Sequence, residues 1–188
     1  MKIGIISDTH GSLNDFSEAM VILEDCDKIL HLGDVLYHGP RNGLPESYDP
    51  KTIADGLSKS DKFIYIKGNC DSEVDEMVIG QNLREKERII DVDGYRFYLV
   101  HGHVGTEEDM IRKALDQKAD VLFYGHTHVK KLEHSGGILV CNPGSVCFPK
   151  DIKRSLAIYE NGEISLINME DREIIKTVSI KDDSEEIE

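Results

Sequence analysis

The sequence predicts an α/β fold in which two mixed β-sheets pack face to face with helices outside them. In the first half of the chain, short apolar runs rich in β-branched residues alternate with helical patterns, as in βαβ units. In the second half, apolar runs follow one another in pairs joined by two-residue turns, as in β-hairpins. At 188 residues the chain is long enough for one well-cored domain and short for two, so we expect a single domain.

Four short apolar runs each close on a glycine, a serine or a polar residue. They predict buried parallel strands at residues 2–7, 28–33, 62–68 and 120–125. Apolar residues at helical spacing predict helices at residues 12–25, 50–60 and 106–117. Ser12 is placed to cap the first helix, and Met110, Ala114 and Leu115 are expected on one face of the third. Parallel strands joined through a helix should cross over with the usual right hand.

Three hairpins are predicted in the second half of the chain. They span residues 88–100, 130–142 and 155–169, with turns at Asp93-Gly94, Gly136-Gly137 and Asn161-Gly162. A last strand is predicted at residues 173–180. The ending KDDSEEIE is a charge run without an apolar face, so we expect one domain at residues 1–180 and an acidic flexible tail at 181–188.

The charge balance limits the partners of the chain. Lys and Arg total 22 against 36 Asp and Glu, a formal charge of −14, which disfavours binding along nucleic acid or anionic lipid. Any phosphate must therefore be attracted locally. The apolar start is too short for a signal peptide and no run approaches the roughly 18 to 20 residues of a membrane span, so we expect a cytoplasmic protein. The four cysteines include no CxxC pair and are interpreted as reduced thiols.

Polar side chains follow five of the predicted strands. The groups are Asp8-Thr9-His10, Gly33-Asp34, Gly68-Asn69-Cys70-Asp71, His101-Gly102-His103 and Gly125-His126-Thr127-His128. Parallel strands deliver their carboxyl ends to one edge of a sheet, where ligands of open α/β folds bind, so these groups should converge. In extended chain, residues two apart face the same side, which would let Asp8 and His10, or His126 and His128, face one point.

Each group alone also has an ordinary structural explanation. Asp8 could be a turn or capping residue, GHTH and GNCD could be turns, and His31 inside an apolar run is expected to be a hydrogen-bonded core histidine. Their coincidence at five strand ends favours a metal site. A cluster of two aspartates and several histidines costs several kcal/mol to desolvate, by order of magnitude, and divalent cations relieve that cost.

The ordered motifs DTHG, GD, GNCD, HGH and GHTH resemble the calcineurin-like metallophosphoesterase superfamily. Together with LHLGDVLYHGPRNGLPESYDP, KGNCDSEVDEM and NPGSVCFPK, they resemble its YfcE-type phosphodiesterases from Met1 to about Ile180. The resemblance implies a four-layer αββα sandwich with a dinuclear metal centre. It implies that Asp8, His10 and His128 bind one metal, that Asn69, His101 and His126 bind the other, and that Asp34 bridges them. His103 would be a neighbour and not a ligand, because the family's histidine is the one preceding Gly102.

These ligands indicate the reaction. Imidazole nitrogens with amide and carboxylate oxygens suit manganese, iron, nickel, cobalt or zinc, and the resemblance favours manganese. Two divalent ions about 3.5 to 4 Å apart can activate a shared water and hold phosphate oxygens. Together with this chemistry, the resemblance implies hydrolysis of small phosphodiesters by a hydroxide bridging two metals, with Asn69, Cys70 and His101 in the catalytic centre.

Cys70 departs from the wider superfamily, in which a histidine often follows the asparagine and assists the leaving group. A thiol with an ordinary pKa near 8.5 is a poorer proton donor than imidazole at neutral pH, although near metals it could ionise. This predicts a bias toward esters with good leaving groups. Cys70 is also compatible with a neutral role beside the metals and the substrate.

The loop at residues 36–50 offers two substrate-binding candidates. Arg41 suits a phosphate through its forked donors, and His38 lies close to it in the sequence, although a loop arginine could equally form a surface ion pair. Other functions use the same residues: a phosphomonoesterase, a nuclease, or a protein-binding scaffold resembling the retromer subunit. All seven expected ligand positions carry competent side chains, which favours catalysis. The sequence leaves open whether the chain forms a homo-oligomer.

Overall fold

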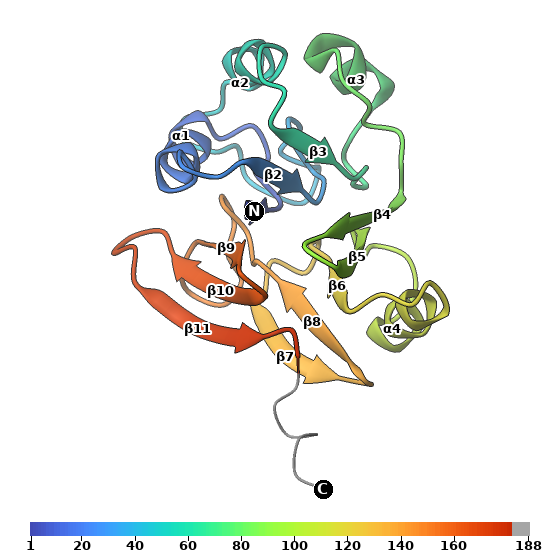
Figure 1. Cartoon of the computed structure of the whole chain (residues 1–188). Coiled ribbons are helices and arrows are strands. Elements are labelled where there is room, and N and C mark those ends of the chain that lie inside the picture. Colours follow the sequence, from blue (N-terminus) through green and yellow to red (C-terminus); the bar gives the residue numbers. More distant parts are fainter. Residues whose placement is uncertain (182–188) are drawn as a thin grey trace, which may run out of the picture.

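The computed structural model describes residues 1–181, which form two β-sheets and four helices (Figure 1). The first sheet has the order β11-β10-β9-β1-β2-β3. Its strands are β1 (Lys2–Ile6), β2 (Lys28–His31), β3 (Phe63–Tyr65), β9 (Ser155–Glu160), β10 (Glu163–Asn168) and β11 (Ile174–Ser179). The second sheet has the order β4-β5-β6-β8-β7. Its strands are β4 (Glu87–Val92), β5 (Tyr95–Val100), β6 (Val121–Phe123), β7 (Lys131–Ser135) and β8 (Ile138–Asn142).

Both sheets mix parallel and antiparallel pairs. Strands β1, β2 and β3 run parallel, whereas β9, β10 and β11 join them as antiparallel neighbours. In the second sheet, β5, β6 and β8 run parallel, and β4 and β7 are antiparallel edge strands. Strands β1, β2, β3 and β6 were the apolar runs of the sequence, and the antiparallel pairs β4-β5, β7-β8 and β9-β10 were the predicted hairpins. The two-residue turns of these hairpins have positive φ, at Asp93-Gly94, Gly136-Gly137 and Asn161-Gly162.

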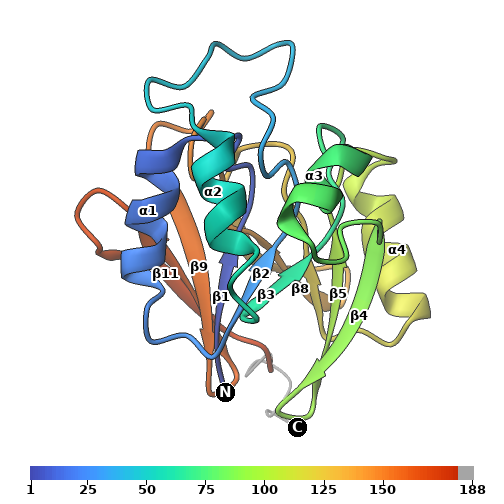
Figure 2. The same ribbon diagram turned by 90° about the horizontal axis from the view of Figure 1, so that it is seen from above.

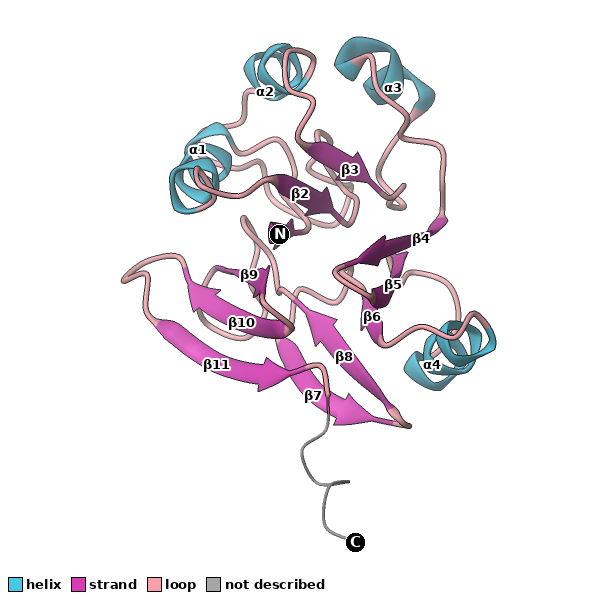
Figure 3. Ribbon diagram, viewed as in Figure 1, coloured by secondary structure: helices cyan, strands magenta, loops and turns pink. Residues whose placement is uncertain are grey.

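The helices are α1 (Leu13–Ile22), α2 (Pro50–Leu57), α3 (Glu73–Ile79) and α4 (Glu107–Asp116), and they lie outside the strands (Figure 3). One buried cluster fills the space between the sheets, with Phe97, Phe123 and Tyr159 at its centre. A second joins the first sheet to α1, α2 and α3, and a third joins the second sheet to α4. Three apolar layers between four structural layers confirm the predicted αββα sandwich.

Helix α3 was not predicted, although its signals are in the sequence. Ser72 and Asp75 form a reciprocal capping box at its start, and Gly80 ends it with a φ of 69°. Its apolar residues are mostly exposed, so the amphipathic pattern that predicted the other helices is weak here.

Ser12 is the N-cap residue of α1, as expected, but its hydroxyl makes no capping bond to a backbone N–H and instead donates to the Asp15 carboxylate at 2.5 Å. The predicted face of α4 was partly wrong. In α4 the buried face consists of Met110, Ile111 and Ala114, while Leu115 is exposed. Leu115 follows Met110 by five residues, about 140° round the helix from it, which places Leu115 at the margin of that face. No helix within residues 1–181 is long and apolar enough to span a membrane.

The carboxyl ends of the parallel strands place the motifs on one edge of the sandwich. A long loop at residues 35–49 leaves the end of β2, passes over this edge and returns to α2 (Figure 2). The single domain at residues 1–180 stays a prediction. Apart from Lys181, the predicted acidic tail lies outside the described residues.

Candidate metal centre

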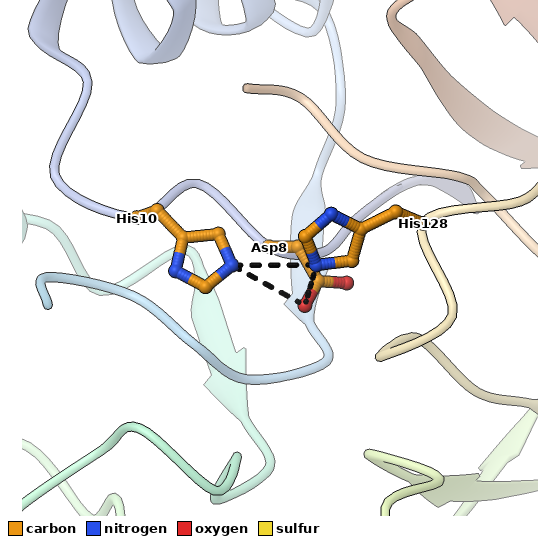
Figure 4. A group of neighbouring side chains, drawn as sticks. All are labelled: Asp8, His10 and His128. Atoms are coloured by element: carbon orange, nitrogen blue, oxygen red, sulfur yellow. Dashed lines mark hydrogen bonds and ion pairs between the residues drawn. The ribbon is translucent and has the colours of Figure 1, made fainter. Parts of the chain in front are cut away.

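Two groups of three side chains meet at this edge. Asp8, His10 and His128 form the first group (Figure 4), and Asp34, His101 and His126 form the second. Within each group one ligand atom per residue lies within 4.8 Å of the others. Asp8 and His10 share the loop after β1 and His128 follows β6, whereas Asp34, His101 and His126 follow three different strands, so the fold brings together side chains that are up to 120 residues apart in sequence.

In the first group, imidazole nitrogens surround one carboxylate oxygen. Asp8 Oδ1 lies 3.2 Å from His128 Nε2 and 3.8 Å from His10 Nε2, and the two nitrogens are 3.4 Å apart. His10 Nδ1 lies 2.8 Å from the Tyr37 carbonyl and His128 Nδ1 lies 2.6 Å from the Phe148 carbonyl. A carbonyl only accepts, so each Nδ1 carries a proton and donates it. When neutral, both rings therefore point Nε2 lone pairs at the same space.

A divalent cation fits this donor set. Among residues 1–181, Asp8 Oδ1 is buried without a hydrogen-bond partner, whereas Oδ2 accepts the His126 N–H at 3.0 Å. An unpaired carboxylate oxygen facing two imidazole lone pairs is costly unless a positive charge lies between them. The nitrogen and oxygen donors suit borderline divalent metals.

The second group is built in the same way around His101. Its Nδ1 lies 2.7 Å from the Leu32 carbonyl and donates to it, and its Nε2 lies 3.4 Å from Asp34 Oδ2 and 3.2 Å from Asn69 Oδ1. The ring of His126 lies across this space, 5.1 Å from the His101 ring between centroids. Asn69 thus lies beside the second group, where the resemblance placed it.

Asp34 lies between the two groups. Its Oδ2 is 3.4 Å from His101 Nε2 and 3.9 Å from His10 Nε2 of the first group, while its Oδ1 accepts the Cys70 N–H at 2.8 Å. One oxygen is thus held by the backbone and the other faces both groups. This is the position that a bridging ligand would occupy.

The proximity of these charges shifts the pKa values. Burial raises the pKa of Asp8 and Asp34, but the close approach of His128 to Asp8 and of His101 to both carboxylates outweighs burial, and the net pKa of each is lowered. Burial lowers the pKa of His101, but the hydrogen bond to Asp34 and the charges of both aspartates raise it to about 9. Burial lowers the pKa of His10 and His126. The two carboxylates therefore remain charged and able to hold a cation at neutral pH.

The backbone of the centre differs from the extended chain that we expected. Five predicted ligands have left-handed backbone conformations with φ between 48° and 64°: Asp8, His10, Asp34, His126 and His128. They lie beyond the ends of the strands, so alternation along a strand does not aim them. His126 and His128 consequently face different groups. Such conformations in non-glycine residues cost about 1–3 kcal/mol each and cluster at functional sites.

Two glycines allow the loops to approach. A Cβ on Gly68 would lie 2.1 Å from Asp34 Oδ1, and a Cβ on Gly33, where φ is 105°, would lie 2.7 Å from Gly68 Cα. The loops after β2 and β3 therefore pack backbone against backbone, which only glycine permits.

Asp71 was not predicted to have a role at the site. It is buried, and its carboxylate accepts three backbone N–H groups, from Asp34 at 2.9 Å, Val35 at 2.8 Å and Gly68 at 2.7 Å. Burial outweighs these bonds and raises its pKa to about 6. Asp71 therefore stabilises the loop that carries Asp34. In the sequence, only its place in the GNCD motif indicated this role.

Hydrogen bonds from Asn142 stabilise the loop that carries His126 and His128. Asn142 Nδ2 donates to the Gly125 carbonyl at 2.9 Å and to Thr127 Oγ1 at 3.0 Å. Ser145 Oγ donates to the Asp8 carbonyl at 2.9 Å. These residues belong to the NPGSV segment, which thus links the loops after β1 and β6.

His31 is the core histidine that we expected. It is fully buried, its Nε2 lies 2.9 Å from Thr9 Oγ1, and its Nδ1 accepts the Gly33 N–H at 3.3 Å. Burial lowers its pKa to about 3, which keeps it neutral. It supports the Asp8-Thr9-His10 loop from below and is not part of either group.

A cleft of about 590 Å³ opens over both groups. Arg41 lines it, as does Lys150, a second cation that the sequence analysis did not single out. His103 also lines the cleft, with its ring 5.4 Å from that of His101, but it belongs to neither group. His38 is not among the lining residues, because its ring packs 4.7 Å from Tyr37 and edge-on against another loop tyrosine. The geometry thus supports Arg41 as a substrate contact more than His38.

Cys70 lies in the cleft beside both groups. Its Sγ lies within 4.8 Å of ligand atoms of His10 and Asp34. Burial and the Asp34 charge raise the pKa of the thiol to about 12. Among these side chains Cys70 therefore stays a neutral thiol, which agrees with a poor proton donor.

Comparisons with known proteins agree with this geometry. A model of the calcineurin-like phosphoesterase superfamily domain matches residues 1–163. The chain is 39% identical to the phosphodiesterase YfcE of Escherichia coli, covering 96% of this chain and 98% of that protein. It is 30% identical to a phosphodiesterase of Methanocaldococcus jannaschii, covering 78% and 85%.

Solved structures show the same fold. The phosphoesterase YfcE of E. coli superimposes with a TM-score of 0.87 at 36% identity, covering 96% of this chain and 100% of that one. Vps29 of Entamoeba histolytica, in complex with zinc, superimposes with a TM-score of 0.67 at 20% identity, covering 96% and 100%. At that identity the second likeness concerns the fold alone.

Proposed function

Since the chain belongs to the calcineurin-like phosphoesterase superfamily and is a hydrolase of that family, we propose that it cleaves small phosphodiesters with two divalent ions bound at the two groups. The observation that carries the proposal is Asp34, whose Oδ2 faces both His10 and His101 while its Oδ1 is held by the Cys70 N–H. When bound, such a pair of ions supplies an activated water as nucleophile and binds the phosphate oxygens.

The residues divide between two ions in the proposal. Asp8, His10 and His128 hold one ion, Asn69, His101 and His126 hold the other, and Asp34 is shared. The carbonyls that accept the Nδ1 protons of three of these histidines fix their tautomers and orient their Nε2 atoms. This arrangement needs little reorganisation when metal binds.

Manganese is our proposed metal, with iron, nickel, cobalt and zinc as alternatives of similar ligand preference. The donor set has no thiolate ligand, and the Cys70 thiol keeps its proton in this charge environment. This supports a metal that accepts oxygen and nitrogen ligands.

Arg41 and Lys150 are proposed to orient the substrate. Both line the cleft, in a chain whose formal charge is −14, so they add local positive charge where a phosphate must enter. The same negative charge supports a small diester over a long nucleic acid. A cytoplasmic location, and any assembly into a homo-oligomer, remain predictions from the sequence.

The proposal is tested by activity of the chelated protein during a titration with Mn²⁺. We expect bis(4-nitrophenyl) phosphate to be cleaved faster than 4-nitrophenyl phosphate, with activity returning as metal is added. His126→Ala should abolish activity, whereas His134→Ala, which removes a histidine on β7 outside the centre, should not.

Other outcomes would replace the proposal. Faster cleavage of the monoester would indicate a phosphomonoesterase. Two bound ions without cleavage of either ester would favour a metal-bound scaffold, and failure to bind metal would contradict every function considered for this site.

A further inference from the structure

A second hollow adjoins the metal cleft. It has a volume of about 530 Å³ and is lined by residues of α2, of α3 and of the loop after β2. Tyr37 and Cys70 line both hollows, so the two hollows adjoin at these side chains. We call it the apolar annex.

The walls of the apolar annex are mostly apolar. Helix α2 contributes Pro50 and Ala54, and α3 contributes Val74 and Val78. The loop adds the rings of Tyr37 and Tyr48. Val74 and Val78 are 63% and 51% exposed, so two large apolar side chains on one helix face are left open to the annex. A surface of this kind favours an uncharged organic group.

The charges at the annex oppose a second phosphate. Asp55 and Asp75 lie in its lining against a single cation, Lys51. In the metal cleft, by contrast, Arg41 and Lys150 are present. The two hollows therefore differ in polarity: one suits an anion and the other suits an apolar group.

We propose that the apolar annex binds one of the two ester groups of the phosphodiester and selects for aryl or bulky alkyl groups. This inference rests on the proposed function, because it places the phosphate at the metal centre. A phosphodiester carries one negative charge and two organic groups, and the annex is an apolar surface next to the metal cleft that can receive one of them. The Tyr37 carbonyl accepts a hydrogen bond from His10 Nδ1. Tyr37, which lines both hollows, is therefore bonded directly to a residue of the first group.

The test compares two inhibitors of bis(4-nitrophenyl) phosphate hydrolysis. Phenylphosphonate and methylphosphonate carry the same anionic group, but only the first has a ring that could occupy the annex. Wild-type protein should bind phenylphosphonate more tightly. In Val74→Ser/Val78→Ser the inhibition constant of phenylphosphonate should rise about fivefold, while that of methylphosphonate changes less than twofold.

Met77 provides a matched control. It lies on the same helix and is 79% exposed, but it lines a different hollow, beside Glu76 and Gln81. Met77→Ser should leave both inhibition constants unchanged. Because all three positions are exposed, the variants should keep the melting temperature of the wild type.

The outcomes separate the two proposals. Hydrolysis with equal inhibition of wild type and Val74→Ser/Val78→Ser by phenylphosphonate would overturn the annex and leave the phosphodiesterase intact. An equal effect of Met77→Ser would also overturn it, as a non-specific effect of α3. Absence of hydrolysis by the wild type would refute the proposed function, and the annex with it.

Discussion

At the scale of single residues, the histidines proposed to bind metal are oriented by hydrogen bonds from their Nδ1 atoms. His10, His101 and His128 each donate Nδ1–H to a carbonyl, of Tyr37, Leu32 and Phe148 respectively. The sequence motifs identified the histidines but not these acceptors. The acceptors are backbone atoms, which any residue type provides, so only the folded chain reveals them.

Arg41 is the residue whose role can be tested most simply. Arg41→Ala should raise the KM for bis(4-nitrophenyl) phosphate about tenfold and leave kcat and metal content nearly unchanged, because the side chain lines the cleft without joining either metal group. Steady-state kinetics and metal analysis check this. Arg112→Ala removes an exposed arginine of α4 and should change neither constant. An unaltered KM in Arg41→Ala would remove the contact from the account.

Substitution of Cys70 tests whether this position supplies the proton to the leaving group. Because burial raises its thiol pKa to about 12, Cys70 is a poor donor near neutral pH. Cys70→His should raise kcat for esters with poor leaving groups roughly tenfold, and change kcat for 4-nitrophenyl esters little. Cys70→Ser is the control and should show no such gain. The dependence of kcat on leaving-group pKa measures the effect, and the same slope in all three proteins would exclude a proton-transfer role for this position.

At the scale of elements, the sequence located the site but not its backbone. The apolar runs predicted which strands end at the shared edge, and that edge carries the motifs. Alternation along a strand was then applied beyond the strand ends, where it fails: Asp8, His10, His126 and His128 have left-handed φ. Turn conformations are set by hydrogen bonds to distant loops, such as those of Asn142 and Ser145, which periodicity does not encode.

Asp71 shows how two loops are held as one unit. Its carboxylate accepts N–H groups from the loop after β2 and from the loop after β3. Asp71→Asn keeps the shape but turns an amide N–H₂ toward these donors, leaving at least one unpaired. The free energy of unfolding should fall by about 2 kcal/mol, and affinity for Mn²⁺ should fall about tenfold as Asp34 loses its anchor.

Urea unfolding and calorimetric titration check this prediction. Asp61→Asn, at an exposed aspartate, should change neither quantity. Metal affinity that survives in Asp71→Asn despite lost stability would show that Asp34 is positioned by other contacts.

At the scale of the whole molecule, periodicity predicted two sheets packed face to face with helices outside, because most strands and helices bury a regular apolar face. The four-layer αββα sandwich was implied by the family resemblance. The exceptions are informative. Helix α3 leaves Val74, Met77 and Val78 exposed, so its burial pattern gave no helical signal. The apolar annex beside α3 could not be predicted either, because it depends on how α2 and α3 pack.

Metal binding should release a proton from the protein. In the chelated protein, the raised pKa of His101, about 9, means that its imidazole is protonated at pH 7. Metal needs the Nε2 lone pair, so binding must release a proton, and affinity for Mn²⁺ should rise about tenfold per pH unit from pH 6 to pH 8. Calorimetry in buffers of different ionisation enthalpy measures the protons released. An affinity independent of pH would contradict this release.

The same shift affects stability without metal, with a definite sign. A histidine whose folded pKa is raised binds its proton more tightly in the folded state, so its stabilising contribution is complete below its ordinary pKa. For His101 that contribution is lost as pH rises from about 6.5 through about 9. Bound metal should remove this dependence.

The central claim is that two ions bind at the two groups and share Asp34. Its most direct test is a crystal structure of the protein grown with Mn²⁺, with anomalous scattering recorded at the manganese edge. We expect two peaks about 3.5 to 4 Å apart. One should lie beside Asp8, His10 and His128, and the other beside Asp34, His101 and His126. A single peak, or two peaks that do not both contact Asp34, would contradict the account.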